Sequence, residues 1–189
     1  MNNLKIRIAT LEDAPGLLDI YAYYVQNTAI TFEYQVPSLA EFENRMRGIL
    51  EKYPYIVAER EGHILGYAYA GPFKGRPAYQ WAGETSIYVQ KDCKKEGIGK
   101  ALYTFLEEIL KRQNFQNLYA CIAYPVIEDE YLTKDSVYFH EKLGYRMVGE
   151  FFQCGYKHHR WYNMVWMEKM IGEHPEAPKP IIAFRDLNE

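Results

Sequence analysis

Apolar and polar side chains alternate along several short stretches of the chain, which is the pattern of half-buried β-strands. The clearest case is the N-terminal stretch 5–9, where lysine and arginine alternate with isoleucine. Two β-rich runs, 55–60 and 64–70, flank Glu61-Gly62-His63 and predict a β-hairpin. By these criteria we predict strands at 5–9, 55–60, 64–70, 81–89, 118–123, 145–152 and 160–170, with the last two joined through Gly155.

The strongest helical pattern covers 97–113, where apolar side chains recur at three- and four-residue spacing and share one face. A second helix is predicted at 38–51, because Ser38 and Glu41 form a capping-box pair. Further helices are predicted after Thr10 and at 136–143, the latter closed by Gly144. The order β-α-α-β-β-β-α-β-α-β-β predicts an α+β fold, with one mixed sheet and helices on both faces.

The length of 189 residues, of which 48% are hydrophobic, suits one domain with one core. After residue 170, three prolines (Pro175, Pro178 and Pro180) disfavour regular structure. We therefore expect a domain at 1–170 and an irregular tail at 171–189 that packs on its surface.

Charge and cysteine content exclude several classes of protein. A net charge of -3 argues against a nucleic-acid partner, and no stretch approaches the roughly 20 apolar residues that cross a bilayer. The N-terminus lacks the apolar segment of a signal peptide. Three cysteines without a CxxC motif (Cys93, Cys121 and Cys154) indicate reduced thiols in a cytoplasmic protein. We expect no metal at His158-His159, because adjacent strand residues point to opposite faces.

The strongest chemical feature is the junction between the predicted strand 81–89 and the helix 97–113. Gly97 and Gly99 at the helix N-terminus let the backbone approach a ligand, and the free N–H groups there favour an anion. Lys94, Lys95 and Lys100 add positive charge. Tight packing of strand against helix explains the glycines equally well. A Walker A loop is excluded because no GK[ST] is present, and Leu102 replaces the third glycine of a Rossmann fingerprint.

These residues carry a resemblance. Lys94-x-x-Gly97-x-Gly99, preceded by the strand Ile87-Tyr88-Val89, resembles the acetyl-CoA motif of the GNAT acyltransferase superfamily. Motifs over nearly the whole chain resemble its phosphinothricin N-acetyltransferase branch, among them Thr31-Phe32-Glu33, Tyr69-Ala70-Gly71-Pro72, Glu84-Thr85-Ser86, His140-Glu141-Lys142-Leu143-Gly144 and Gly155-Tyr156-Lys157-His158. The resemblance implies the GNAT fold, acetyl-CoA as acyl donor, a small amino-acid-like acceptor and a homodimer.

The resemblance also implies which residues bind the donor. The backbone of Ile87, Tyr88 and Val89 would hydrogen-bond pantetheine and polarise the thioester carbonyl. The pyrophosphate would lie on Lys94, Lys95, Glu96, Gly97, Ile98, Gly99 and Lys100. Ser136 begins the helix that contacts the coenzyme, and Thr133 stands where the branch has asparagine.

For the chemistry, the resemblance implies that Glu84 is the general base, which removes a proton from the acceptor amine. His140 would act as an auxiliary acid or base. Without the resemblance, Glu84 reads as a solvent-facing residue at a strand end, and His140 as a packed or surface histidine. The implied acceptor site comprises Phe32, Lys74, Arg76, Tyr79, Glu84, Thr85 and Lys157, with lysine and arginine suited to a carboxylate or phosphinate.

Three departures from the branch pattern leave questions open. Lys94 replaces the usual arginine or glutamine. Glu96 is a carboxylate near two phosphates, and is tolerable only if it points away from them. An apparent insertion, Glu128 to Leu132, adds acidic residues and leaves acceptor choice open. Phosphinothricin, methionine sulfone or sulfoximine and proteinogenic amino acids remain candidates, as do protein or peptide N-acetylation and a non-catalytic acyl-CoA sensor.

Overall fold

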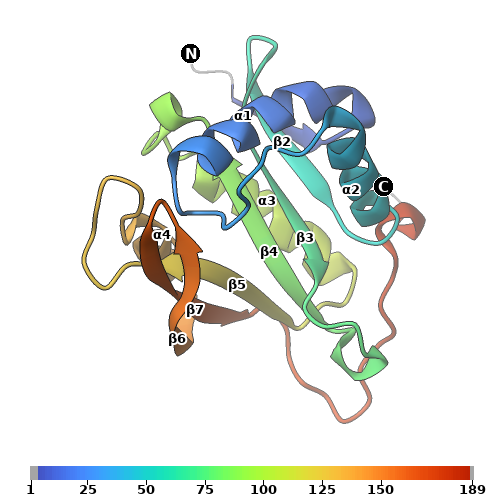
Figure 1. The fold of residues 1–189 in the computed structure, drawn as a ribbon. Coiled ribbons are helices and arrows are strands. Elements are labelled where there is room, and N and C mark those ends of the chain that lie inside the picture. Colours follow the sequence, from blue (N-terminus) through green and yellow to red (C-terminus); the bar gives the residue numbers. More distant parts are fainter. Residues whose placement is uncertain (1–3, 188–189) are drawn as a thin grey trace.

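The computed structural model describes residues 4–187 and contains one mixed sheet with four α-helices (Figure 1). The strands are β1 (Lys5–Ile8), β2 (Tyr55–Arg60), β3 (His63–Pro72), β4 (Ala82–Val89), β5 (Asn117–Tyr124), β6 (Arg146–Lys157) and β7 (Arg160–Met170). The α-helices are α1 (Ala14–Asn27), α2 (Leu39–Leu50), α3 (Ile98–Arg112) and α4 (Asp135–Lys142). Short 3-10 helices are η1 (Leu11–Asp13), η2 (Pro77–Tyr79), η3 (Lys91–Cys93) and η4 (Phe184–Asp186). The predicted α+β class and order of strands and α-helices are confirmed.

The strands lie in the order β1-β2-β3-β4-β5-β7-β6, and β4 with β5 is the parallel pair among otherwise antiparallel neighbours. A parallel pair needs a crossover connection, and α3 supplies it between β4 and β5. The N-terminus of α3 therefore follows directly from the end of β4, which is where the glycine motif lies.

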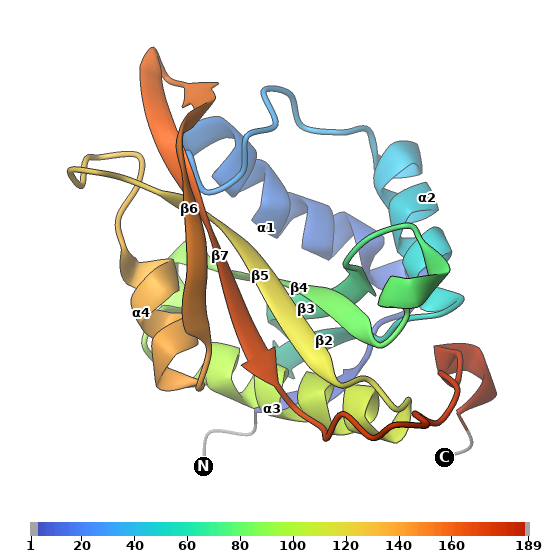
Figure 2. The same ribbon diagram turned by 90° about the horizontal axis from the view of Figure 1, so that it is seen from below.

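The two faces of the sheet carry separate apolar cores. Along β2, Ile56 and Ala58 pack toward α3, whereas Tyr55 and Val57 pack toward α1 and α2. This alternation is the two-residue period of a strand that is buried on both sides. Figure 2 shows α1 and α3 on opposite sides of the strands. The prediction of helices on both faces is confirmed.

Two predicted connections differ from the structure. The β2–β3 turn consists of Glu61 and Gly62 alone, with φ of 53° and 79°, the left-handed pair of a tight hairpin. The prediction that Gly155 joins the last two strands is wrong. A β-bulge between Phe151 and Gly155 absorbs the extra residues, so β6 bends and continues to Lys157.

The segment after β7 returns across the end of α3. Trp81 Nε1 donates to Lys179 O (2.7 Å), and Gln113 Nε2 donates to Ile182 O (2.7 Å). Phe184 of η4 packs against the edge of the α3-side core. Within residues 4–187, no helix combines the length and apolar character needed to cross a membrane.

Candidate active site

The two parallel strands separate at a fork. Pairing of β4 with β5 ends at Glu84 and Tyr119, yet β4 continues to Val89 and β5 to Tyr124. Figure 1 shows the two strands diverging beyond this point. Past the fork, the facing edges of β4 and β5 do not pair with each other, so their backbone groups are available to a ligand.

A cavity lies at this fork. Its strand walls are residues 85–88 of β4 and 120–123 of β5. The remaining lining residues come from the helices and loops around the fork: Ile30, Lys94, Tyr103, Leu132, Thr133, Asp135, Ser136 and His140. The structure thus brings together seven of the predicted site residues, namely Thr85, Ile87, Tyr88, Lys94, Thr133, Ser136 and His140.

The N-terminus of α3 has the geometry of an anion site. Gly97 is its N-cap, with φ of 82°, and the first helical bond runs from Ala101 N to Gly97 O (3.0 Å). The N–H groups of Ile98, Gly99 and Lys100 therefore have no partner within the helix. A Cβ at Gly99 would lie 3.0 Å from the Phe139 ring. Gly99 thus permits close packing, whereas Gly97 supplies the positive φ that begins the helix, and the backbone donors of the first turn are left for a phosphate.

Other residues expected at the coenzyme have different surroundings. Lys95 is exposed. The Glu96 carboxylate accepts two bonds from the Arg60 guanidinium (both 3.0 Å), so its charge is neutralised. Lys100 borders a second hollow, against Ile6 and Phe105. Two other residues predicted to bind the coenzyme have contacts within the protein. The Val89 carbonyl accepts from Tyr24 OH, and the Ile98 side chain is buried in the core.

Glu84 is the last paired residue of β4 before the fork. Since Thr85 faces α3, its neighbour Glu84 faces the opposite side of the sheet, the side of α1 and α2. Burial raises the pKa of the Glu84 carboxyl, and Lys74 offsets part of this increase. A half-buried carboxylate with a raised pKa is a better proton acceptor than an exposed one.

His140 is buried on the α3 side of the sheet, within a network of hydroxyl groups. Its Nδ1 lies 2.7 Å from Ser136 O, and its Nε2 lies 3.1 Å from Tyr103 OH. The Tyr103 hydroxyl lies 3.3 Å from Thr85 Oγ1, which contacts Tyr145 OH at 3.2 Å. Burial lowers the pKa of His140 to about 4. The ring is therefore neutral, with its proton on Nδ1 because a carbonyl can only accept.

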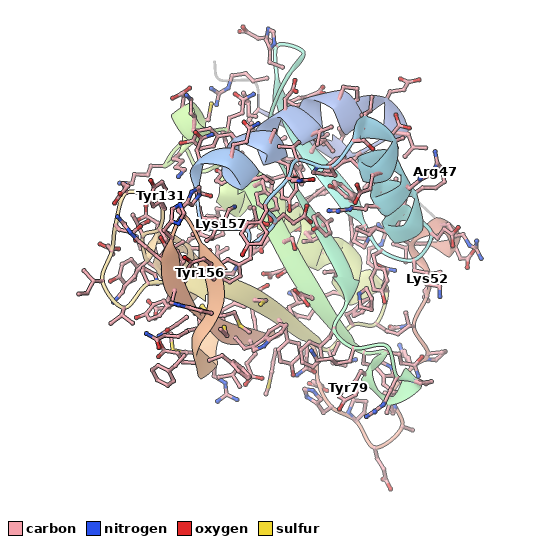
Figure 3. All side chains as sticks on the ribbon, viewed as in Figure 1. Arg47, Lys52, Tyr79, Tyr131, Tyr156 and Lys157 are labelled. Atoms are coloured by element: carbon pink, nitrogen blue, oxygen red, sulfur yellow. The ribbon has the colours of Figure 1, made fainter. Side chains whose placement is uncertain are left out.

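The predicted acceptor residues do not converge. Lys74 Nζ lies over the rings of Phe73 (4.8 Å) and Trp166 (5.1 Å). The loop that holds Arg76 and Tyr79 is exposed, and Figure 3 shows Tyr79 far from Lys157.

Lys157 and Phe32 have partners within the protein. Lys157 is buried, and its Nζ donates to Thr31 O (2.7 Å). Burial lowers the pKa of its amine. The Phe32 ring stacks with Tyr162, with their centroids 6.5 Å apart. Both residues therefore hold the α1–α2 loop against the β6–β7 hairpin.

Sequence patterns did not single out the β5 wall or Tyr103. The β5 wall could have been found from the predicted strand 118–123. A helix connects this strand to the strand 81–89, and two strands joined by a helical crossover pair in parallel. Cys121 lies on this wall. Burial raises the pKa of its thiol to about 11, so the thiol is protonated at neutral pH.

His158 and His159 do not lie in a strand, contrary to the expectation. They form the β6–β7 turn, with φ of 50° and 61°, because the bulge extends β6 up to Lys157. The His158 ring stacks on Tyr131. Within the described part of the chain, no three histidine, cysteine or acidic side chains cluster closely enough to hold a metal ion.

Comparisons with known proteins agree with this geometry. Residues 6–166 match the family model described as an acetyltransferase (GNAT) domain. A phosphinothricin N-acetyltransferase of Streptomyces viridochromogenes is 33% identical over 94% of this chain and 93% of that protein. An L-methionine sulfoximine/L-methionine sulfone acetyltransferase of Pseudomonas aeruginosa is 31% identical over 92% and 98%. The crystal structure of a phosphinothricin acetyltransferase from Sinorhizobium meliloti in complex with AcCoA superposes with a TM-score of 0.84, at 32% identity over 96% and 98%.

Proposed function

As a member of the GNAT acetyltransferase family, the chain is an acetyl-CoA-dependent N-acetyltransferase, and we propose that it acetylates the α-amine of a small amino-acid-like acceptor. The observation that carries the proposal is the fork, where a carboxylate of raised pKa, Glu84, lies at the vertex of the open strand pair. The relatives named above acetylate amino-acid analogues, which makes phosphinothricin, methionine sulfone, methionine sulfoximine and related amino acids the acceptors to test.

The donor would be held by residues that the fork leaves unpaired. The edge of β4 at Ile87 and Tyr88 offers backbone groups to the amides of pantetheine, as an added strand would, whereas Val89 O already accepts from Tyr24 OH. The N–H groups at the start of α3, with Lys94, suit the pyrophosphate. Thr133 and Ser136 border the same cavity. When bound, acetyl-CoA supplies the activated acetyl group.

Glu84 would act as the general base of the transfer. An α-amine is largely protonated at neutral pH, with an ordinary pKa of about 7.7–8.0, and a protonated amine cannot attack. The Glu84 carboxylate takes this proton, directly or through water, and the amine nitrogen forms the new N–C bond as the C–S bond breaks. The nitrogen then loses its second proton to solvent, the released thiolate takes up a proton from solvent, and Glu84 returns its own proton to solvent. Lys74, whose charge acts on the Glu84 carboxyl, would pair with the α-carboxylate of the acceptor. Arg76, on the same exposed loop, is a second candidate for this contact.

We assign His140 a positioning role. A neutral imidazole whose two nitrogens are both engaged has no proton to spare at pH 7. It also lies on the side of the sheet opposite Glu84. Through Tyr103 it fixes the hydroxyl of Thr85, the first residue of β4 beyond the fork.

Release of free thiol from acetyl-CoA, measured with a panel of amino acids and peptides, tests the proposal. We expect turnover with at least one free amino acid or analogue. Turnover only with peptides or proteins would instead identify a protein N-acetyltransferase. Tight binding of acetyl-CoA without any turnover would identify an acyl-CoA sensor.

We further propose that the protein forms a homodimer through β6, the edge strand of the sheet. Large apolar side chains are exposed on this strand and on its neighbour β7: Met147, Val148, Phe151 and Phe152 on β6, and Trp161 on β7. Phe152 is 75% exposed. An edge strand with such side chains is a site for pairing, and a second copy of the same edge completes it by two-fold symmetry.

Sedimentation equilibrium tests the homodimer. We expect two chains per particle for the wild type and one for Phe152→Glu, since a buried carboxylate at the interface has no partner. Ile127→Glu is a matched control outside this surface, on a residue that is 83% exposed, and should remain dimeric. A monomeric wild type at micromolar concentration contradicts the proposal.

A further inference from the structure

The segment 128–132, which the resemblance predicts to be an insertion, is an ordered turn organised by one carboxylate. Asp129 Oδ1 accepts from the backbone N–H groups of Tyr131 (2.8 Å) and Leu132 (2.9 Å). Asp129 Oδ2 accepts from Tyr162 OH (2.9 Å) and pairs with Arg160 Nη1 (2.9 Å). Burial opposes the charge, but these partners hold the pKa of Asp129 below its ordinary value. The acidic insertion is therefore anchored to β7.

The β6–β7 turn and the first residue of β7 contact the insertion at further points. The Arg160 guanidinium makes a two-pronged contact with the Glu130 carboxylate (2.8 and 2.9 Å). The His158 ring stacks on Tyr131, with centroids 4.1 Å apart and planes within 11°. Figure 3 shows Tyr131 and Lys157 at the same corner of the molecule. A two-pronged contact between arginine and a carboxylate fixes the relative orientation of the two side chains more narrowly than a single ion pair does.

The same turn and the insertion also hold the α1–α2 loop. Ala29 N donates to Tyr131 O (3.0 Å), and a His158 nitrogen contacts Thr28 O (3.2 Å). Three segments that are distant in the sequence are thus linked to one another: residues 28–31, 128–132 and 157–160. We call this set of contacts the loop clamp.

The loop clamp ends at the wall of the cavity. Leu132 follows Tyr131 directly, and Ile30 follows Ala29, and both side chains line the cavity at the fork. Leu132 is 3% exposed and packs with Ala29, Ala123 and Tyr162. The positions of these two apolar wall residues therefore depend on contacts made by Asp129 and Arg160, neither of which lines the cavity.

We propose that the loop clamp is an acceptor-positioning device, in which Arg160 and Asp129 hold Ile30 and Leu132 against the apolar part of the acceptor. This rests on the proposed function. The clamp does not contact the N-terminus of α3, where the pyrophosphate of the donor would bind, so loss of the clamp should weaken acceptor binding more than donor binding. The methylene or methyl groups of the acceptor would contact this aliphatic wall.

Steady-state kinetics of Arg160→Ala test this proposal. We expect the acceptor KM to rise about fivefold, the scale of losing a partly exposed charged contact, with kcat and the acetyl-CoA KM within about twofold. Arg160→Lys keeps the charge but loses the two-pronged contact, so its KM should be intermediate. Arg146→Ala is the matched control, because Arg146 pairs with Glu168 at the other end of the same hairpin. An unchanged acceptor KM, or an acetyl-CoA KM that rises equally, overturns the proposal.

Amide hydrogen exchange separates this proposal from the proposed function. If the wild type acetylates no amino acid, the proposed function fails, but the clamp is still measurable at the amides of Ala29, Tyr131 and Leu132. Faster exchange at these amides in Arg160→Ala, but not in Arg146→Ala, supports the clamp. Unchanged exchange contradicts it.

Discussion

Replacing Glu84 by glutamine is expected to lower kcat by about 10²–10⁴, the usual contribution of a general base. Glutamine keeps the size of the side chain and its place at the fork, but it cannot accept the proton of the acceptor ammonium. Binding of acetyl-CoA should be unchanged, because the expected donor contacts lie farther along β4 and on α3. Thiol release at saturating substrate measures the first effect, and calorimetry measures the second.

The pH profile makes this prediction specific to proton transfer. Burial raises the pKa of Glu84, so the wild-type kcat/KM should fall as the pH drops through that raised pKa and the carboxylate becomes protonated. Glu84→Gln should lose this acidic limb. Glu108→Gln, on the exposed face of α3, is the matched control and should behave as the wild type. Wild-type turnover in Glu84→Gln at every pH would remove Glu84 from the mechanism.

The second large effect concerns stability, and comes from the buried His140. Burial lowers its pKa from 6.5 to about 4, so the unfolded chain binds a proton more readily than the folded one. The contribution of neutral His140 to stability is therefore complete above pH ~6.5 and is lost as the pH falls toward 4. Between about pH 7 and pH 5 this amounts to about 2 kcal/mol.

Urea denaturation at these two pH values tests the prediction. The free energy of unfolding of the wild type should fall by about 2 kcal/mol more than that of His140→Gln, in which the titrating group is absent. Aspartate and glutamate residues titrate in both proteins, so their contributions to the pH dependence of the unfolding free energy cancel when the two proteins are compared. His63→Gln, at the exposed first residue of β3, is the matched control and should follow the wild type. An equal pH dependence in His140→Gln would show that the buried imidazole is not linked to folding.

The order of the elements was predictable because it depends on local patterns. The apolar stripe of residues 98–110 and the capping pair of Ser38 with Glu41 each act within a single helix, and the structure contains both helices. The junction at Gly97 was predictable for the same reason, since the special φ and the start of α3 are local properties. These features need no knowledge of which elements meet in space.

The organisation of the site depended on contacts that no local pattern encodes. Glu84 and His140 lie on opposite sides of the sheet, which requires knowing that Thr85 faces α3. Lys157 is predicted to contact the acceptor through its charge, whereas in the structure it is buried and donates to Thr31 O, 126 positions away. The pairing of Arg160 with Asp129 likewise depends on the hairpin that the β-bulge extends.

Calorimetric titration of acetyl-CoA into the protein tests the central claim most directly. This claim is that the α3 N-terminus, with Gly97 and Gly99, binds the donor at the fork. We expect one molecule bound per chain, with a dissociation constant between about 1 μM and 1 mM. Gly97→Val should bind at least about tenfold more weakly, because valine is strained at the φ of 82° that orients the free N–H groups. No heat with folded wild-type protein, or equal affinity in a folded Gly97→Val, would contradict the account.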